Sequence, residues 1–324
     1  MANLYSTSGL SFLPTVSPEH IKNGDSTEDY FKAFVLKNPF GTITDDNVQV
    51  YDGGMAYLHT GMYTFELGDA GSRTPVAARF SYMWRKEGND WKITHHHSSV
   101  VPAASNEKVL DVARVSPSDV FGSKVGGSCA PDTHTACFSR AASVFRTSDV
   151  GVQQDSSHLL FIPILTHVIF CMQSNFKRWN DALQTKNPKS VANLYDSSNL
   201  SFLPTVSPKH ITGRGSTEDY FTDFVMKNPF GVITDDSVQS YEDGKAYLHT
   251  GLYTFELGEG AARAPVQARF SYMWRKVGDD WKITHHHSSV RPAGPDMNAI
   301  ARVCHTHIPD TNTLSHACGA ANTL

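Results

Sequence analysis

Cysteine is scarce in this chain of 324 residues, and neither an excess of positive charge nor a membrane-length apolar run is present. The five cysteines all lie outside the two segments with a folded-domain pattern, so we expect no disulfide framework within those segments. Cysteine usage therefore does not distinguish an oxidising from a reducing compartment. A net charge of -4 and a sequence pI of about 6.4 leave no basic stripe for a phosphate backbone, which argues against nucleic-acid binding. One apolar stretch, residues 159–172, is too short for a membrane span and is interrupted by Pro163.

An internal repeat organises the chain. The decapeptide of residues 91–100 (WKITHHHSSV) recurs without a change at residues 281–290. At the same offset, the segment from Ala2 to about Pro102 matches the chain from residue 192 onward without a gap, with roughly three quarters of the positions identical. A unit of roughly 100 to 120 residues is as long as a whole domain, which argues against a solenoid of short repeats. The sequence therefore predicts two copies of one small domain.

We divide the chain into two domains (1–103 and 174–294), a linker (104–173) and a tail (295–324). The linker and the tail have no sustained period, and their composition predicts disorder. Phe176, Trp179, Ala182 and Leu183 fall on one face of a helix that opens the second domain. No such helix precedes the first repeat. We therefore expect a first domain that lacks its first helix, in a chain truncated at its start and without a targeting segment.

Within each unit the periodicity changes from helical to extended. After a short apolar run at residues 10–13, Ser26 is expected to cap a helix whose apolar residues recur at i, i+4. Four extended segments follow the helix, at residues 43–51, 56–67, 76–86 and 91–100. Residues 88–89 suit a tight hairpin turn between the last two. We predict an α+β fold in which a curved antiparallel sheet wraps around N-terminal helices and leaves a conical cavity.

Side chains alternate between the two faces of a strand, and this alternation assigns the histidines. Trp91, Ile93, His95, His97 and Ser99 share one face, and because the first two are apolar, that face is expected to line the interior. The polar members of this set would then point into the conical cavity. The same polar positions in the second repeat are His285, His287 and Ser289. In the alternative interpretation, these are hydrogen-bonded core residues or the edge of a subunit interface.

The three consecutive histidines do not predict a metal site. Adjacent residues point to opposite faces of a strand, so at most His95 and His97 could bind one ion, and no third ligand with clear spacing is present. We therefore expect no cofactor, with manganese or zinc as the alternative. The tail holds further cysteines and histidines whose spacing fits no standard zinc framework: Cys304, His305, His307, His316 and Cys318.

Hydroxyl groups are the other polar groups expected in the cavity. Thr15 follows the short first strand, Tyr30 lies in the first turn of the helix, and Tyr63 and Tyr82 come from the extended segments. Their counterparts in the second repeat are Thr205, Tyr220, Tyr253 and Tyr272. A pocket of His, Ser, Thr and Tyr with few charges suits a small neutral or singly anionic ligand. Each tyrosine is equally consistent with a half-buried residue whose hydroxyl is satisfied within the core.

With these residues in place, the sequence resembles the iota-class carbonic anhydrases, which are built from domains of the nuclear transport factor 2-like fold. The resemblance covers both repeats and rests on LPTVS at residues 13–17, EDYF at 28–31, G-x-Y-x-F at 61–65, and Trp91 with HHHSS at 95–99. It implies tandem cone-shaped domains and the reversible hydration of carbon dioxide to bicarbonate. Members are described as acting without metal, although a manganese requirement has been proposed for some. The resemblance also suggests a plastid or secretory compartment.

The resemblance implies one catalytic pocket in each repeat: Thr15, Tyr30, His97 and Ser99 in the first, and Thr205, Tyr220, His287 and Ser289 in the second. The residues expected to contact the substrate are Tyr63, Tyr82, His95, Tyr253, Tyr272 and His285. We expect His97, or His287, to take the proton that water loses, because an imidazole with a pKa near about 6.5 suits that exchange. A polarised Tyr or Ser hydroxyl is the rival proton acceptor.

A second resemblance is to the association domain of calcium/calmodulin-dependent protein kinase II, which has the same fold and a similar Trp...His-x-His-x-Ser strand. That domain assembles subunits into rings and is not an enzyme, so it implies an oligomerisation or small-ligand-binding module. Tyr82 and Tyr272 stand where that domain presents an arginine. A third alternative is a different enzyme on this fold, such as a small-molecule isomerase. Because sheets of this fold pair back to back, we expect either a homodimer or pairing of the two repeats within the chain.

Overall fold

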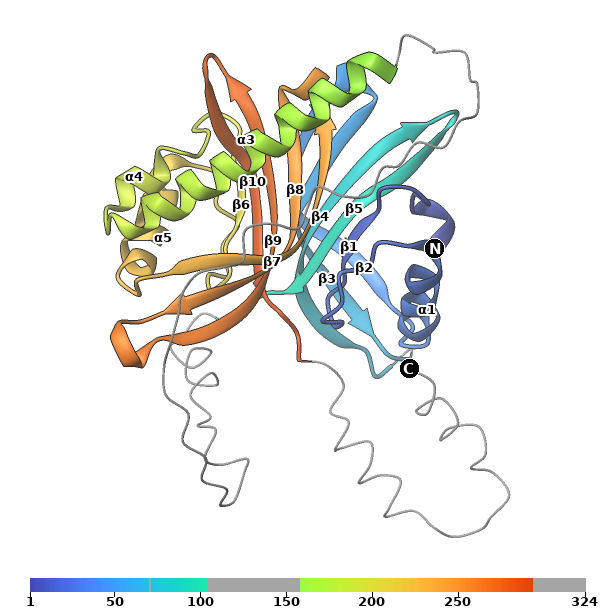
Figure 1. The fold of residues 1–324 in the computed structure, drawn as a ribbon. Coiled ribbons are helices and arrows are strands. Elements are labelled where there is room, and N and C mark those ends of the chain that lie inside the picture. The colour runs from blue at the N-terminus through green and yellow to red at the C-terminus, as the bar shows by residue number, and fades with distance from the viewer. Residues whose placement is uncertain (70, 104–157, 294–324) are drawn as a thin grey trace, which may run out of the picture.

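The two repeats fold into two α+β units, with their sheets side by side at the centre of the molecule and their helices on the outside (Figure 1). The computed structural model describes residues 1–69, 71–103 and 158–293. Each unit contains one five-stranded sheet, ordered β1-β5-β4-β3-β2 in the first and β6-β10-β9-β8-β7 in the second. The predicted architecture of two tandem α+β domains is confirmed.

The elements of the first domain are η1 (Ala2–Leu4), β1 (Ser11–Leu13), α1 (Gly24–Val35), β2 (Phe40–Tyr51), η2 (Asp52–Gly54), β3 (Ala56–Leu67), β4 (Thr74–Glu87) and β5 (Asp90–Val100). Strand β1 runs parallel to β5, and the remaining neighbours are antiparallel. The predicted strands all occur, with ends shifted by a few residues. The predicted cap of the helix is wrong, because Asn23 takes that position and its Oδ1 accepts a hydrogen bond from the backbone N–H of Ser26 at 2.8 Å.

The elements of the second domain are α3 (His158–Gln184), α4 (Pro188–Ala192), β6 (Ser201–Leu203), α5 (Arg214–Val225), β7 (Phe230–Tyr241), η5 (Glu242–Gly244), β8 (Ala246–Leu257), η6 (Gly260–Ala262), β9 (Ala264–Val277) and β10 (Asp280–Val290). The strand pairing repeats that of the first domain, with β6 parallel to β10. The two copies therefore share one topology, as their sequence identity requires.

Helix α3 corrects the predicted limit of the linker. The helix begins at His158, so residues 158–173 are helical where disorder was expected, and the chain passes Pro163 without leaving the helix. The expectation of disorder for residues 104–157 and for the tail lies outside the described residues. Within the described part of the chain, no helix combines the length and the apolar character needed to cross a membrane.

Helix α3 covers the second domain and makes it more enclosed than the first domain. Trp179 and Leu183 are buried in the core of that domain, and Asn175 Nδ2 donates a hydrogen bond to the Tyr247 hydroxyl at 2.8 Å. Tyr247 is fully buried, whereas Tyr57 at the equivalent position is partly exposed. Among residues 1–69 and 71–103, no helix takes the place that α3 has in the second domain. The second cone is therefore the better-sealed environment for chemistry.

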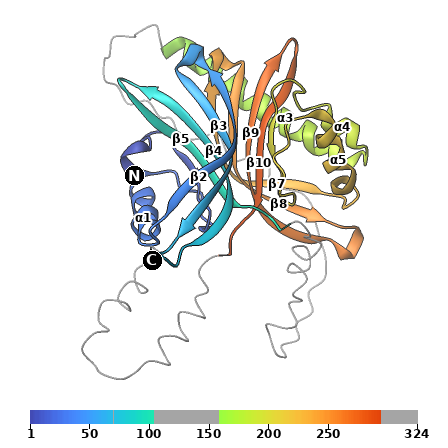
Figure 2. The ribbon, with the colours of Figure 1, turned by 180° about the vertical axis from the view of Figure 1, so that it is seen from behind.

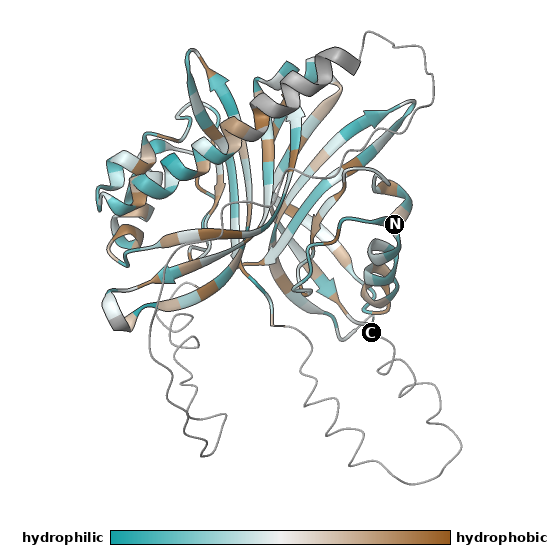
Figure 3. Cartoon of the chain, viewed as in Figure 1, coloured by the Kyte–Doolittle hydropathy of each residue, from teal (hydrophilic) through white to brown (hydrophobic). Residues whose placement is uncertain are grey.

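The two sheets pack back to back through one face of each, as the view from behind also shows (Figure 2). A shared apolar core joins them, and its members are Tyr51, Ala56, Leu58, Met83, Tyr241, Ala246, Leu248 and Met273. Hydrophobic and hydrophilic segments alternate along these strands (Figure 3). Gln49 Nε2 donates to the backbone oxygen of Thr284 at 2.9 Å, and Gln239 Nε2 donates to that of Thr94 at 2.8 Å. In this structure the interface therefore lies within one chain.

Replacing Trp179 by alanine is expected to destabilise the second domain by about 3 to 5 kcal/mol, because the indole is fully buried and its removal leaves a cavity. The measurement is thermal unfolding of the full chain. The matched control is Phe170→Ala on the same helix, whose side chain is 70% exposed and whose loss should change little. Equal effects of the two substitutions would show that α3 does not seal the second cone.

Candidate functional site

A β-bulge decides which histidines enter each cone. In the pairing of β4 with β5, Met83 lies opposite His95 and Trp84 lies opposite Ile93, so Thr94 is the extra residue. The same irregularity occurs in β10 between Ile283 and His285. An extra residue reverses the side-chain alternation after it, because the period of a strand is two. The faces of the residues beyond the bulge are therefore opposite to those predicted.

In the second domain, the cone contains His286 and Ser288 instead of the residues predicted from simple alternation. The Ser288 hydroxyl makes short hydrogen bonds with the hydroxyls of Tyr253 and Thr205. The Tyr220 hydroxyl accepts hydrogen bonds from the backbone of Val206 and Thr205 and so lies beside this group. Burial raises the pKa of Tyr220 and of Tyr253 well above the usual range, so both phenols stay protonated. The result is a chain of neutral hydroxyls that both donate and accept.

The first domain repeats this cluster. Ser98 makes short hydrogen bonds with the hydroxyls of Tyr63 and Thr15, and Tyr30 lies next to Thr15. Burial again raises the pKa of Tyr63. The structure places the Thr and Tyr residues named in the sequence analysis inside the cones: Thr15, Tyr30, Tyr63, Tyr82, Thr205, Tyr220, Tyr253 and Tyr272.

A directed hydrogen-bond chain sets the tautomer of His286. Trp179 Nε1–H donates to the Tyr195 hydroxyl at 3.1 Å, and that hydroxyl donates to His286 Nδ1 at 2.8 Å. The indole nitrogen only donates, so the Tyr195 hydroxyl accepts from Trp179, and His286 Nδ1 is the acceptor available for the single proton of that hydroxyl. His286 therefore carries its own proton on Nε2. Burial lowers the pKa of His286 well below 6.5, so the ring is neutral.

The Nε2 atom of His286 is buried and has no hydrogen-bond partner among the described residues, and the same holds for His96 Nε2. The His286 ring is held between Tyr272 and Phe202, with ring centroids 4.1 and 4.8 Å away. A buried polar atom without a partner is rare, and its occurrence in both copies points to a ligand or a water inside the cone.

The other histidines hold the two domains together. Ser99 Oγ, at 2.8 Å, donates to His287 Nε2, and His287 Nδ1 donates to Ser81 Oγ at 2.9 Å. Ser81 then donates to His285 Nε2 at 2.9 Å, and His285 Nδ1 donates to the backbone oxygen of Ser201 at 2.9 Å. The terminal carbonyl can only accept, so every direction in this chain is determined. Both nitrogens of each imidazole are used within the interface.

A second chain mirrors the first and runs through Ser289, His97, Ser271 and His95 to the backbone oxygen of Ser11, with each separation 2.9 Å. The rings of His97 and His287 stack at 3.7 Å between centroids. Burial lowers the pKa of all four interface histidines, which keeps them neutral as the network requires.

The predicted direction of six site residues is therefore wrong, and the cause is the bulge at Thr94 and Thr284. These residues face the other domain instead of the cone: His95, His97, Ser99, His285, His287 and Ser289. Of the alternatives, that of hydrogen-bonded core residues fits them, at an interface between the two domains of one chain. The position expected for the proton acceptor in the cone is taken by His96 and His286.

Two arginines that the sequence analysis did not select adjoin the cone clusters. Arg79 lies in β4 between Ala78 and Phe80, and Arg269 occupies the same place in β9. Arg79 reaches across the interface and donates to the backbone oxygens of Pro204 and Ser288, directly behind the hydroxyl cluster of the second domain. The sequence did contain a signal for these arginines. In both copies an arginine lies between two apolar residues of a strand, and the alternation of side chains places it on the opposite face from them, which is the interface face.

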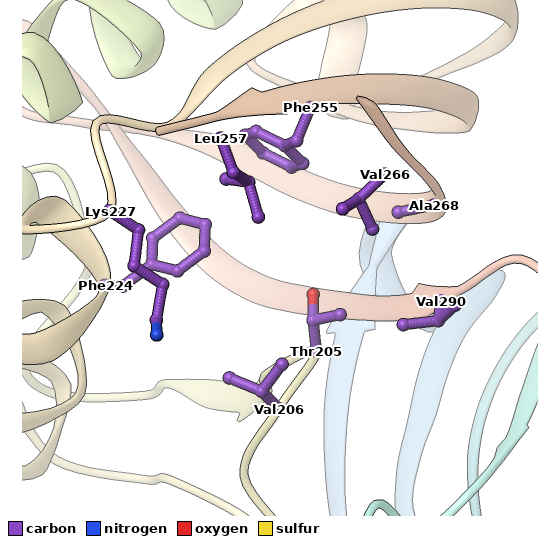
Figure 4. A pocket seen from close by; sticks show the side chains of 9 residues that line it. All are labelled: Thr205, Val206, Phe224, Lys227, Phe255, Leu257, Val266, Ala268 and Val290. Atoms are coloured by element: carbon purple, nitrogen blue, oxygen red, sulfur yellow. The ribbon is translucent and has the colours of Figure 1, made fainter. Parts of the chain in front are cut away.

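A small cavity opens onto the hydroxyl cluster of the second domain (Figure 4). Its volume is about 30 Å³, enough for a molecule of a few atoms. The walls are mostly apolar, and the hydroxyl of Thr205 points into the enclosed space (Figure 4). The lining residues are Thr205, Val206, Phe224, Lys227, Phe255, Leu257, Val266, Ala268 and Val290. An apolar pocket with a hydroxyl at one end suits a small, weakly polar molecule.

The donor set of the described residues does not fit a protein-bound metal. Nowhere in residues 1–69, 71–103 and 158–293 do three or more His, Cys, Asp or Glu side chains come together as ligands. Each cone contains one imidazole of the last strand, His96 or His286, and His95 and His97 are engaged in the interface. The predicted tail cysteines and histidines lie outside the described residues.

Comparisons with known proteins agree with this architecture. Residues 1–102 and 172–292 match the family model of the calcium/calmodulin dependent protein kinase II association domain. A solved structure from Xanthomonas campestris, described as a candidate domain of that family, is 38% identical over 37% of this chain and 86% of that chain, with a TM-score of 0.36. A search of curated proteins finds no match.

Two further solved structures carry names of the same fold. A candidate dehydratase of the NTF2-like family from Streptomyces avermitilis is 17% identical and covers 38% of this chain and 94% of that chain, with a TM-score of 0.33. An NTF2-like protein with a cystatin-like fold from Novosphingobium aromaticivorans is 10% identical and covers 47% of this chain and 97% of that chain, with a TM-score of 0.36. With family matches on both repeats, the chain belongs to the calcium/calmodulin dependent protein kinase II association domain family and carries two tandem domains of the nuclear transport factor 2-like fold.

Proposed function

We propose that the chain is a carbonic anhydrase that reversibly hydrates carbon dioxide to bicarbonate inside the cones. The observation that carries the proposal is that the second cone contains both His286, whose buried Nε2 has no hydrogen-bond partner among the described residues, and a chain of neutral hydroxyls at Ser288, Thr205 and Tyr253. The first cone contains the same groups, with His96 and Ser98. The second cone is the preferred site because α3 seals it. The resemblance to the iota class motivates the choice of reaction.

In the proposed reaction, the oxygen of a water attacks the carbon of carbon dioxide. One C–O bond forms, one O–H bond of the water breaks, and negative charge moves onto the oxygens of the nascent bicarbonate. His286 Nε2–H and the Tyr220 hydroxyl are suited to donate hydrogen bonds to those oxygens as the charge develops, which is the most effective use of a fixed donor in a buried site. The apolar walls around Thr205 suit the uncharged substrate.

The proton of the attacking water leaves through the hydroxyl chain in this proposal. Ser288 and Thr205 each donate and accept, so they can pass a proton toward solvent while returning to their starting protonation states. His97 and His287 do not take this role, because both nitrogens of each ring are engaged between the domains. His286 is a donor at Nε2 for the reason given above. The hydroxyls, the rival to histidine in the sequence interpretation, are therefore the groups proposed here to carry the proton, and solvent is its final acceptor.

We also propose that the reaction proceeds without a metal bound by the protein. The support is the donor set, because among the described residues no three potential ligands converge. Bulk water has a pKa of about 15.7, and a zinc ion lowers that of its bound water to about 7. The hydroxyl cluster has no metal ion that could lower the pKa of a water in this way, so the proposal predicts a turnover rate well below that of zinc enzymes.

The direct test is carbon dioxide hydration by the full chain in a stopped-flow instrument, before and after treatment with a chelator. We expect activity that survives the chelator, and a loss of about 100-fold or more when Ser98→Ala and Ser288→Ala are combined, because the relay and a donor are removed together. Ser17→Ala with Ser207→Ala is the matched control, since both serines lie outside the cones at partly exposed positions. A folded wild-type protein without activity would remove the proposal.

The second candidate is a non-catalytic association module, with which the family membership is consistent. Its specific support is the interface, where two complete hydrogen-bond chains and a shared apolar core join the domains. A protein that is folded, inactive and assembled into larger particles would favour this candidate. Sedimentation of the full chain beside the hydration assay separates the two.

A further inference from the structure

A second, larger cavity lies between the two domains. Its volume is about 390 Å³, and both halves of the molecule contribute equivalent side chains to it. The described lining residues are Thr15, Arg79, Ser99, Val100, Val101, Pro102, Thr205, Val206, Arg269, Ser289, Val290, Arg291, Pro292 and Ala293. Three of them are arginines and none is acidic. The cavity is therefore positively charged and suits a negatively charged ligand.

Arg79 and Arg269 are unusual because they are buried without a counter-ion. Each side chain is 1% exposed. Among the described residues, no carboxylate lies within ion-pair distance of either guanidinium, whereas Arg85 in the same strand pairs with Asp52 at 3.3 Å. A buried, unpaired charge is strongly unfavourable unless something compensates it.

The contacts that each guanidinium makes are all with neutral oxygens. Arg79 Nε donates to Ser99 Oγ at 3.0 Å, and its two terminal nitrogens donate to backbone oxygens of the other domain, with 3.2 Å to Ser288. Arg269 makes the mirror set with Ser289, Pro14 and Ser98. Since a guanidinium has five N–H donors, each arginine retains donors that these contacts do not use.

The two arginines also act on each other. The positive charge of Arg79 is one cause that lowers the pKa of Arg269, after burial, and both pKa values fall to about 9. At neutral pH both groups remain charged, so two like charges face one cavity. An anion between them would relieve the repulsion and supply the missing counter-charge.

We propose that the cavity between the domains binds one small oxyanion of the bicarbonate or carboxylate type between Arg79 and Arg269. The planar guanidinium fork matches the paired oxygens of such anions, and the hydroxyls of Ser99 and Ser289 lie beside it. The cavity adjoins the cones, because Thr15 and Thr205 of the cone clusters also line it. Its anion-binding groups are the two arginines, so its occupancy does not depend on whether the cones hydrate carbon dioxide.

Binding is tested with the full chain by thermal unfolding and isothermal titration calorimetry. The probes are sodium bicarbonate and sodium acetate, each compared with sodium chloride at equal ionic strength and a pH of about 8. At ten times the dissociation constant, we expect the oxyanion to raise Tm by about 3 to 6 °C over chloride. A larger effect of bicarbonate than of acetate would identify bicarbonate as the preferred member of the class, and the reverse order would identify a carboxylate.

The decisive variant combines Arg79→Met with Arg269→Met. It is expected to be at least as stable as the wild type in chloride, because two unpaired buried charges are removed, and to lose the oxyanion-dependent rise in Tm. Arg85→Met is the matched control and should keep that rise, because its guanidinium already pairs with Asp52.

Three results would overturn the proposal. The first is a wild-type Tm that responds equally to oxyanion and to chloride, and the second is a double variant that keeps the full response. The third is the absence of binding heat when the oxyanion is added at up to about 100 times the concentration at which the effect of chloride on Tm saturates. If the double variant does not fold, Arg79→Lys serves instead. It keeps the charge but loses the fork, and should weaken oxyanion binding by about tenfold. Unchanged binding by that variant counts against the site.

Discussion

Below pH 6.5 the protein is expected to lose stability steeply and to unfold at about pH 5. The cause is a set of six fully buried histidines, namely His95, His96, His97, His285, His286 and His287. Burial lowers the pKa of all six, and for His96 and His285 the value falls to about 3. In the folded state these rings are neutral members of the interface and cone networks.

The sign of the effect follows from proton binding. As the pH falls through 6.5, the histidines of the unfolded chain take up protons while those of the folded chain do not. Their contribution to stability is therefore complete above pH 6.5 and is lost progressively between pH 6.5 and the lowered folded values. Each histidine costs about 1.4 kcal/mol per pH unit in that window, so six cost about 8 kcal/mol per unit. A typical protein is stable by only about 5 to 15 kcal/mol, which places unfolding near pH 5.

Circular dichroism of the full chain between about pH 8 and pH 4.5 measures this dependence. His97→Gln combined with His287→Gln provides the control. These substitutions remove two of the six titrating groups, and the dependence of the free energy of unfolding on pH should become shallower by about a third. A Tm that stays constant down to about pH 5 would contradict the assignment of neutral buried rings.

Removing the imidazoles of the cones is expected to abolish most carbon dioxide hydration, while removing those of the interface is not. His96→Phe with His286→Phe keeps an aromatic ring stacked on Tyr82 and Tyr272 but deletes the free Nε2–H donor. Loss of one such donor to a developing oxyanion typically costs about 100- to 1,000-fold in rate. The variant should remain folded, because the ring stacking survives.

The matched comparison is His97→Gln with His287→Gln, assayed by the same stopped-flow method. Those rings face the other domain, so activity per folded molecule should change by less than about tenfold while Tm falls. The opposite outcome, an active cone variant and an inactive but folded interface variant, would restore His97 and His287 as the catalytic pair and remove the present assignment.

The repeat and the element types were readable from the sequence. Two copies of one decapeptide at a constant offset establish tandem domains, and the change of period within each copy distinguishes the helix from the strands that follow. Apolar alternation also identified the inward face of the last strand as far as Ile93, which is buried in the core. These features depend on local pattern and on chain identity, which a single sequence contains.

The linker limit and the helix cap were not readable in the same way. Residues 158–173 have an apolar composition that a disordered segment and a helix packed on a sheet both permit, and only packing of α3 on the second domain decides between them. Asn23 and Ser26 are both good caps, and the backbone geometry before Gly24 selects the first.

The sequence by itself determined that each domain would bring histidines and hydroxyls together at the end of its last strand. Only the tertiary structure decided which of them share a cone. Three identical histidines and two serines in a row carry no alternation, so nothing local marks the extra residue at Thr94, and the bulge becomes visible only through the pairing of β5 with β4. The structure alone also brought Arg79 behind the hydroxyl cluster of the other domain, because contacts across an interface depend on how two sheets meet.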